Sequence, residues 1–235
     1  MLKPILVPYR ESECDRDAHL SARELVRLYH NAGYDGMVIT DHYIERFYTL
    51  WFPEEVAGLT HQQQVTRWLK GFRTAREEGE KIGFTVLPGA EVRFDNCPND
   101  YLLYGVHEDF FYTVPRLNEL NSLQKLLTLM PTGACVVQAH PFRDDMVVRR
   151  PQGLFGMEVF NGGTSPFRNE LARQFAQHYG LTQTSGSDIH DMSRLAKGGI
   201  RTEHKIKTPE DLIAVLRSNA YTLIENPDRT PDAKR

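Results

Sequence analysis

Acidic and imidazole side chains recur in this chain just after short apolar segments that are predicted to be strands. Four segments share this layout, and together they carry His42, Glu91, His140, Asp188 and His190. In parallel α/β architectures sites are built at the carboxyl ends of the strands, so we expect these five side chains to share one pocket. Imidazole and carboxylate groups in combination are ligands for divalent transition metals. The pattern therefore predicts a metal site.

Each of these residues also has an ordinary structural interpretation. His42 could be a hydrogen-bonded residue at a strand end, and a single glutamate in a loop, such as Glu91, is usually a solvated surface group. A carboxylate that emerges from a buried strand nevertheless needs a partner, because burying it alone is costly. Gly186 gives the turn before Asp188 the freedom to bring two side chains to one site. A shared polar site explains the recurrence better than five independent groups.

The segments around these residues alternate between strand-like and helix-like patterns. Strands are predicted over 36–40, 84–87, 101–106, 134–139, 156–161, 181–185 and 221–224. Helices are predicted from a capping box at Ser21 to Gly33, over 60–82, 116–130 and 167–179, and from a second capping box at Thr208. The aromatic-rich residues 43–59 are expected to form an irregular insert. Such alternation implies a parallel sheet, here closed into a barrel.

Composition favours an ordinary soluble globular protein over a nucleic-acid-binding or membrane protein. The 235 residues are 40% hydrophobic and 25% charged, and the net charge of −3 provides no basic excess for nucleic acid. No apolar run approaches the length of a membrane span, and residues 1–8 are too short and proline-broken for a signal peptide. Three widely spaced cysteines without a CxxC motif fit a reducing cytoplasm. We expect one domain over residues 1–226 and a polar tail over 227–235.

A set of short motifs gives the chain a family resemblance. In order along the chain, the motifs are AGYDGMVITDHY, LPGAEVRF, NDYLLYG, VVQAHPF, GMEVFNG and TSGSDIH. Their order and content resemble those of the PHP (polymerase and histidinol phosphatase) superfamily over about residues 20–200. The resemblance implies a distorted seven-stranded β/α barrel of TIM-like type, up to three divalent metals at its C-terminal face, and phosphoester hydrolysis.

The resemblance fails at the first strand. The family opens with a His-x-His pair that supplies two ligands to one metal, whereas here Pro8 and Arg10 fall about where that pair should be. The first histidine of the chain is His19. The first metal position would therefore retain only Glu91 and Asp188.

The other two metal positions of the family are better preserved in this sequence. The second would keep Glu91 and His140, with Asp100 or Tyr101 where the family often has a histidine. The third would keep His42 and His190, completed by Asp15, Asp17 or His19. The chain is thus expected to bind fewer than three divalent ions, and a mixed histidine and carboxylate set suits Zn, Mn or Fe.

Under the resemblance, catalysis would depend on His140, Glu91 and Asp188. A metal cluster hydrolyses a phosphate ester by neutralising phosphate oxygens and by lowering the pKa of a bound water to about 7. Arg10 could replace the charge of the missing metal, because guanidinium matches phosphate geometry, but it could not generate hydroxide. Arg143 and Arg194 are further candidates for binding the phosphate, the alternative being that they are solvated loop arginines.

Two hypotheses of different classes follow. The first is a metal-dependent phosphoesterase that acts on a small phosphorylated metabolite, as histidinol phosphatases do, with a reduced metal set. The second is a catalytically impaired descendant that uses the same fold as a phosphate-binding or regulatory module. Retention of five metal-type residues favours the enzyme, and loss of the His-x-His pair favours the binding module.

Overall fold

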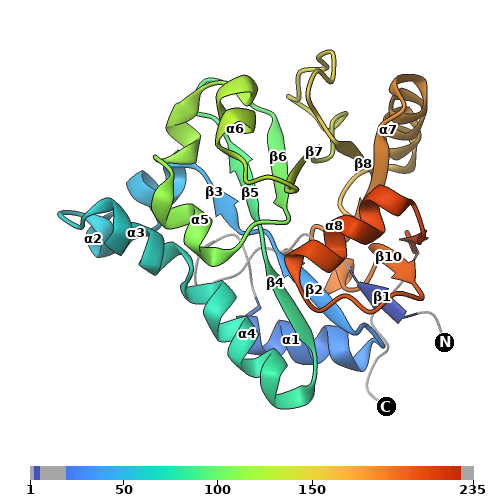
Figure 1. The fold of residues 1–235 in the computed structure, drawn as a ribbon, viewed down its shortest axis with the longest axis horizontal. Coiled ribbons are helices and arrows are strands. Elements are labelled where there is room, and N and C mark those ends of the chain that lie inside the picture. The colour runs from blue at the N-terminus through green and yellow to red at the C-terminus, as the bar shows by residue number, and fades with distance from the viewer. Residues whose placement is uncertain (1–2, 6–19, 229–235) are drawn as a thin grey trace.

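The computed structural model describes residues 3–5 and 20–228, which form two mixed β-sheets surrounded by helices (Figure 1). The strands of the described residues are β1 (Lys3–Ile5), β2 (Gly36–Ile39), β3 (His42–Tyr43), β4 (Thr85–Pro88), β5 (Ala90–Arg93), β6 (Asp100–Tyr104), β7 (Cys135–Gln138), β8 (Gly156–Asn161), β9 (Thr182–Gly186), β10 (Gly198–Thr202) and β11 (Thr222–Glu225).

The described part of the chain also forms a set of helices around these sheets (Figure 1). They are α1 (Ala22–Asn31), α2 (Pro53–Val56), α3 (His61–Trp68), α4 (Lys70–Ile82), α5 (Glu108–Thr113), α6 (Leu123–Leu129), α7 (Pro166–Tyr179) and α8 (Pro209–Ser218). A π-helical turn, η1 (Phe47–Trp51), and two 3₁₀ turns, η2 (Leu117–Leu120) and η3 (Met192–Arg194), complete the set. Helices α1 and α4 lie side by side against β2 and β4, and α7 packs on β8 (Figure 1).

The sheets contain the expected parallel pairing, and antiparallel pairs occur beside it. One sheet has the order β11-β10-β1-β2-β4 and the other has the order β3-β5-β6-β7-β8-β9. The β1–β2–β4, β3–β5 and β7–β8–β9 pairs are parallel, whereas β5–β6 and β6–β7 are antiparallel. The turn of residues 94–99 between β5 and β6 is too short for a crossover helix, and parallel pairing requires such a crossover.

The two sheets approach each other where β9 meets β10. The Ser185 hydroxyl accepts a hydrogen bond from the Gly199 amide at 3.1 Å, and the Ser187 hydroxyl accepts one from the Gly198 amide at 2.9 Å. Gly198 lies directly against the backbone of Gly186, where an added methyl group would clash. The closed seven-stranded barrel expected from the family resemblance stays a prediction, because the ladders form two sheets.

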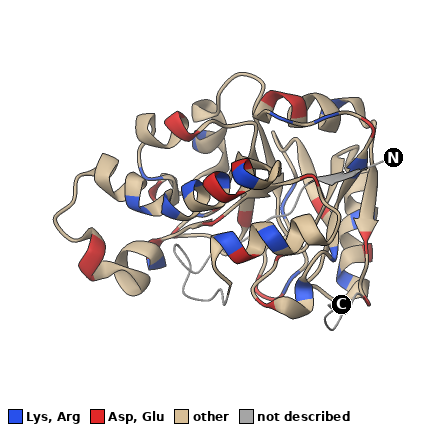
Figure 2. Cartoon of the chain, turned by 90° about the horizontal axis from the view of Figure 1, so that it is seen from below, with Lys and Arg blue, Asp and Glu red and all other residues tan. Residues whose placement is uncertain are grey.

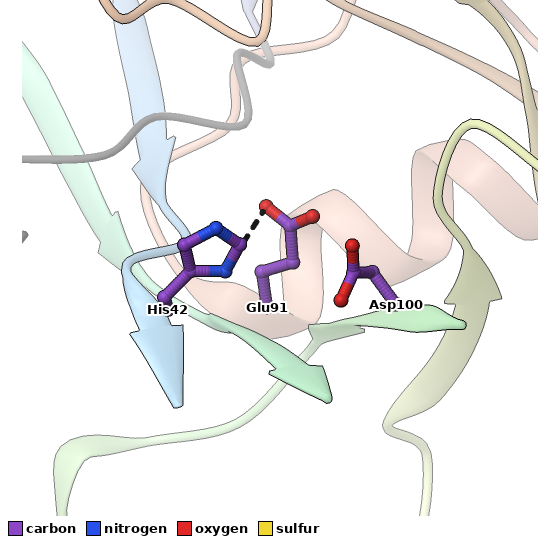
Figure 3. Close-up of side chains that lie close together, drawn as sticks. All are labelled: His42, Glu91 and Asp100. Atoms are coloured by element: carbon purple, nitrogen blue, oxygen red, sulfur yellow. Dashed lines mark ion pairs between the residues drawn. The ribbon is translucent and has the colours of Figure 1, made fainter. Parts of the chain in front are cut away.

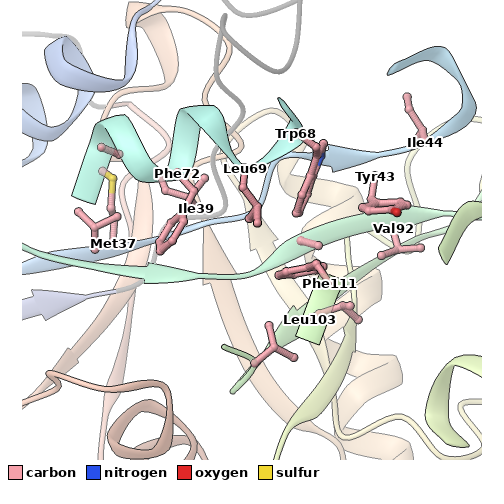
Figure 4. Packing of buried hydrophobic residues seen from close by; sticks show 14 of the residues in the cluster. Met37, Ile39, Tyr43, Ile44, Trp68, Leu69, Phe72, Val92, Leu103 and Phe111 are labelled. Carbon is pink, nitrogen blue, oxygen red and sulfur yellow. The ribbon is translucent and has the colours of Figure 1, made fainter. Parts of the chain in front are cut away.

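The largest hydrophobic cluster packs α3, α4 and α5 onto β2, β3 and β5 (Figure 4). Trp68 lies at its centre, with its ring 5.0 Å from that of Tyr43 and 4.8 Å from that of Phe111. The Trp68 indole N–H also donates a hydrogen bond of 2.9 Å to the His42 carbonyl oxygen. The cluster therefore fixes the strand end that carries a predicted site residue.

Most of the predicted elements are present, and the differences have local causes. The capping boxes at Ser21 and Thr208 are confirmed. The helix expected over 60–82 divides into α3 and α4 at Leu69, and the helix expected over 116–130 becomes η2 and α6. In the second case Asn121 adopts a left-handed conformation, with φ of 55°, and Ser122 caps a new helix.

Some elements were not predicted. The expected irregular insert contains η1 and α2, while α5, β5 and β10 have no counterpart among the sequence predictions. These elements are short, so they contain too few residues to show a clear hydrophobic periodicity.

Acidic and basic residues are intermixed along the helices (Figure 2). Of the helices in the described part of the chain, none combines the length and the apolar character needed to cross a membrane.

A test of the contact between the two sheets is Gly198→Ala. The added methyl group would meet the Gly186 backbone, which cannot move without disturbing β9. We expect overpacking to lower the free energy of unfolding by about 1–3 kcal/mol, measured by urea denaturation. Thr222→Ala, at an exposed position of β11, is the matched control and should change stability by less than about 0.5 kcal/mol. A Gly198→Ala variant as stable as the control would contradict the tight packing.

Candidate metal centre

Three adjacent strands bring a histidine and two carboxylates together in the protein interior (Figure 3). His42 opens β3 and lies directly opposite Glu91 of the parallel strand β5, with Nδ1 3.9 Å from Glu91 Oε2. Asp100 opens β6, the antiparallel neighbour of β5. Each of the three residues offers one ligand atom, and these atoms all lie within 4.8 Å of one another. All three residues are buried.

His140 joins this group from the end of β7. Its Nε2 lies 3.0 Å from Glu91 Oε1 and 3.5 Å from Asp100 Oδ2. The His140 backbone has a positive φ of 26°, which is rare for a residue with a side chain and costs of order 1–3 kcal/mol when surrounding structure enforces it. Such strain is characteristic of functional positions. In this backbone conformation the His140 imidazole points toward the Glu91 and Asp100 carboxylates.

Burial and charge act against each other on these groups. Burial raises the pKa of Asp100, and the nearby Glu91 carboxylate raises it further. Arg93 opposes this by donating two hydrogen bonds to Asp100, of 2.7 and 2.5 Å. Burial lowers the pKa of His140, but its hydrogen bond to Glu91 and the negative charges of Glu91 and Asp100 outweigh burial, so the net shift is upward. The group therefore favours a positive charge at its centre.

The donor set fits a divalent transition metal. Ligand atoms bound to one ion at roughly 2.0–2.2 Å must lie within roughly 4.4 Å of each other. The 3.9 Å separation of His42 Nδ1 and Glu91 Oε2 meets this condition, and the full set needs a contraction of a few tenths of an ångström. Two kinds of donor, imidazole nitrogen and carboxylate oxygen, suit zinc, manganese and iron alike.

A second polar group surrounds Asp188 after β9. Its carboxylate is in close contact with Arg143 Nη2 and lies 3.5 Å from Arg194 Nη1. Arg194 Nη1 also donates to the Asp188 carbonyl oxygen at 3.0 Å and lies 3.1 Å from His190 Nδ1. Asp188, like His140, has a positive φ, of 46°. Two guanidinium groups thus compensate this buried carboxylate.

A chain of hydrogen bonds connects the two groups. The His140 amide and the Asn161 side-chain amide both donate to Glu158 Oε2, each at 2.9 Å. Asn161 Oδ1 in turn accepts a hydrogen bond of 3.1 Å from Arg143 Nη2, which also contacts Asp188. The two groups therefore form one continuous polar network at the carboxyl ends of β7, β8 and β9.

The sequence-predicted residues divide between these groups. His42, Glu91, Asp100 and His140 lie in the first, while Asp188, His190, Arg143 and Arg194 lie in the second. Arg143 and Arg194 are ion-paired with Asp188, which differs from the solvated loop arginines considered as the alternative. The remaining candidates fall outside the described residues: Arg10, Asp15, Asp17 and His19.

Three residues of the network were missed by sequence reasoning. Glu158 is a buried carboxylate between apolar neighbours of a strand, and a charged residue in that setting was the available signal. Asn161 ends the same strand, and its Oδ1 also accepts hydrogen bonds from the Gly163 amide and the Thr164 hydroxyl, so it organises the following turn. Arg93 gave no signal, since it lies beside Asp100 only through the β5–β6 register.

Comparisons with known proteins bear on the family and on the fold of the chain. The family model described as PHP-associated matches residues 166–221. A two-domain protein from Bacteroides vulgatus, containing a predicted PHP-like metal-dependent phosphoesterase, superposes with a TM-score of 0.66 at 17% identity. The match covers 96% of this chain and 65% of that one, so the chain spans less than two thirds of its length. No curated protein matches the chain by sequence.

Two further structures cover most of their own length. PsfC from Pseudomonas syringae matches with a TM-score of 0.62 and 15% identity over 91% of this chain and 88% of that one. An amidohydrolase from Chromobacterium violaceum, with bound sulfate and no metal, matches with a TM-score of 0.53 and 14% identity over 95% and 98%. At these identities the likeness concerns the fold. The family model and the B. vulgatus structure together support the resemblance to the PHP superfamily.

A first prediction for this site concerns Glu158 and pH. Burial raises the pKa of Glu158 from 4.5 to about 7, so the folded protein holds a proton that the unfolded chain releases. The free energy of unfolding contributed by this group therefore falls as pH rises between these two values. Glu158→Gln keeps an acceptor for the His140 and Asn161 amides and should lose less stability than the wild type between about pH 5 and about pH 8.

The measurement is urea denaturation of both proteins in the presence of a chelator across that range. Glu203→Gln, which changes an exposed carboxylate, should follow the wild type. If Glu158→Gln and the wild type show the same pH dependence, the pKa of Glu158 does not rise on folding.

A second prediction concerns Asp100 and metal binding. Asp100→Asn keeps the side-chain volume but removes a charge that lies against both Arg93 and His140. We expect zinc or manganese affinity to fall about tenfold or more, measured by calorimetric titration of the chelator-treated protein. Asp109→Asn, at an exposed position of α5, should bind as the wild type does. Unchanged affinity in Asp100→Asn would remove this residue from the candidate site.

Proposed function

We propose, from the premise that this is a PHP superfamily protein, that the chain is a metal-dependent phosphoesterase acting on a small phosphorylated metabolite. The observation that carries the proposal is the buried meeting of His42, Glu91, Asp100 and His140, with distances that suit a shared cation. The two-metal or three-metal hydrolases use such mixed donors to neutralise phosphate oxygens and to activate water.

In this proposal His42, Glu91, Asp100 and His140 hold the metal. When bound, it would act as a Lewis acid on phosphate oxygen and lower the pKa of a bound water. Arg93 holds Asp100 in place and opposes the rise in its pKa, and the Trp68 indole holds the backbone at His42. Glu158 fixes the His140 backbone through its amide. The chain's own residues thus pre-form the donor set and exclude bulk water from it.

The Asp188 group would bind the substrate in this proposal. Arg143 and Arg194 lie on one carboxylate at the edge of the same hydrogen-bonded network, and both side chains are partly exposed. Guanidinium groups can hold phosphate oxygens bidentately, and two of them exceed the single negative charge of Asp188. Arg143 supplies positive charge beside Asp188, which the resemblance assigns to the first metal, and this fits the missing His-x-His pair and fewer than three metals.

Expectations about the fold, the metal and the cellular location belong to the same proposal. The two sheets would close into a distorted seven-stranded barrel of PHP type, formed as a single domain over residues 1–226. The metal would be zinc, manganese or iron, and the protein would act in the cytoplasm without nucleic-acid or membrane partners.

A second candidate function is a phosphate-binding or regulatory module without catalysis. The pairing of Asp188 with two arginines favours it, because a carboxylate that neutralises guanidinium groups is less available to a metal. In this alternative the arginines still bind phosphate, but no activated water attacks it.

The deciding experiment is His140→Ala. This change removes the buried imidazole that contacts both Glu91 and Asp100. We expect hydrolysis of p-nitrophenyl phosphate and of small phosphorylated metabolites to fall by at least about a hundredfold, with metal content falling in parallel. Glu91→Gln should act similarly, since it keeps volume and removes charge. His178→Ala, at an exposed position of α7, is the matched control.

The outcomes separate the two functions. Wild-type protein that hydrolyses no phosphate ester with added Mn, Zn or Fe would reject the enzyme and support the binding module. An active wild type matched by both variants would place the chemistry elsewhere. Metal analysis of protein purified without chelator should give fewer than three ions per chain, and three tightly bound ions would contradict the reduced set.

A further inference from the structure

A polar pocket lies on the face of β6 and β7 opposite to the candidate metal centre. Neighbouring residues of a strand point to opposite faces, so Tyr101 faces away from the group that contains Asp100. Gln138 of β7 is the direct antiparallel partner of Tyr101. Both residues line a pocket of about 110 Å³, which the loop carrying Arg149 and Arg150 completes.

Gln138 gives the pocket a hydrogen-bond donor that needs an acceptor. The residue is 3% exposed, and its Nε2 makes no hydrogen bond within the described part of the chain. A buried donor without a partner destabilises a protein, so such groups usually have a ligand or an ordered water as partner. The amide is fixed in place because its strand lies in the middle of the six-stranded sheet.

Two positive charges stand at the opening of the same pocket. Arg149 and Arg150 are exposed, and neither forms an ion pair with a carboxylate of the described residues. The pocket wall on the α6 side adds the polar residues Asn121 and Ser122.

The size of the pocket restricts its ligand. Sites for whole small molecules are typically about 300–1,000 Å³, so a volume of about 110 Å³ suits one small group. Two guanidinium groups and an amide donor are the combination that recognises a tetrahedral oxyanion.

We propose that this pocket binds a phosphate group, held by Arg149, Arg150 and the Gln138 amide. The ligand is either free inorganic phosphate or the phosphate of a monoester whose remaining part stays in solvent. The loop that supplies the two arginines begins at His140 and is tied back by Asn99, which exchanges two hydrogen bonds with Val147, of 2.9 and 2.8 Å. The site is independent of the proposed phosphoesterase activity, because it lies on the opposite face of the strands.

The test is NMR of the side-chain amides of the ¹⁵N-labelled full chain during titration with inorganic phosphate. The Gln138 resonance is identified by its loss in Gln138→Leu. We expect it to shift in a saturable manner in the wild type. Arg149→Gln combined with Arg150→Gln should weaken the apparent affinity about tenfold or more, since each guanidinium contact to an anion is worth about that factor.

Two control variants isolate the pocket. Arg201→Gln combined with Lys205→Gln removes the same charge from exposed positions outside the pocket and should titrate as the wild type does. Arg143→Gln alters the group at Asp188 and should leave the Gln138 titration unchanged, which separates this site from the proposed catalytic one. A second titration with glycerol 3-phosphate distinguishes the sources, because tighter binding than inorganic phosphate identifies a monoester and weaker binding identifies free phosphate.

The proposal is overturned if the Gln138 resonance does not move with either ligand. It is equally overturned if the double arginine variant titrates as the wild type does, or if Arg143→Gln abolishes the shift. Because both arginines are exposed, their replacement should leave the fold intact, and the unchanged remainder of the spectrum verifies this.

Discussion

The cost of burying carboxylates controls the organisation of this molecule. Glu91, Asp100, Glu158 and Asp188 are each no more than 2% exposed. A buried negative charge is tolerated only with a hydrogen-bonded or cationic partner. The structure supplies three kinds of partner: imidazole for Glu91, guanidinium for Asp100 and Asp188, and amide donors for Glu158.

Strand register is what allows these partners to meet. His42 is directly opposite Glu91, and Arg93 is directly opposite Asp100, so two of the contacts are cross-strand neighbours. Closely placed cross-strand pairs interact because their Cβ atoms are about 4.5–5.5 Å apart. The hydrophobic cluster around Trp68 fixes this register from the other face of β3 and β5. Packing and electrostatics therefore constrain the same strand ends.

The sequence predicted the side chains of the site better than their partners. His42, Glu91 and His140 could be found because each follows an apolar run, and Asp100 could be found from the family pattern. The pairing of Arg143 with Asp188 could not, because local sequence does not say which loop cation reaches a carboxylate 45 positions away. Helix start signals at Ser21 and Thr208 were reliable since capping is local. The break at Leu69 and the strand β5 depend on tertiary packing, which periodicity does not report.

The difference between a guanidinium and a metal ion decides where chemistry can occur in such a network. Both neutralise a carboxylate, but only the ion lowers the pKa of a water enough to make it a nucleophile near neutral pH. Asp188, in contact with Arg143 and near Arg194, is therefore suited to holding an anion in place. Glu91 and Asp100, which share His140, are suited to holding a cation.

If the chain hydrolyses phosphate esters, the attacking water must then form on the His42–Glu91 side, with the phosphate oriented from the Asp188 side. The hydrogen bonds from His140 through Glu158 and Asn161 to Arg143 keep these two sides in fixed relation. That rigidity is what an in-line attack requires, because catalysis by positioning depends on keeping the reacting groups aligned.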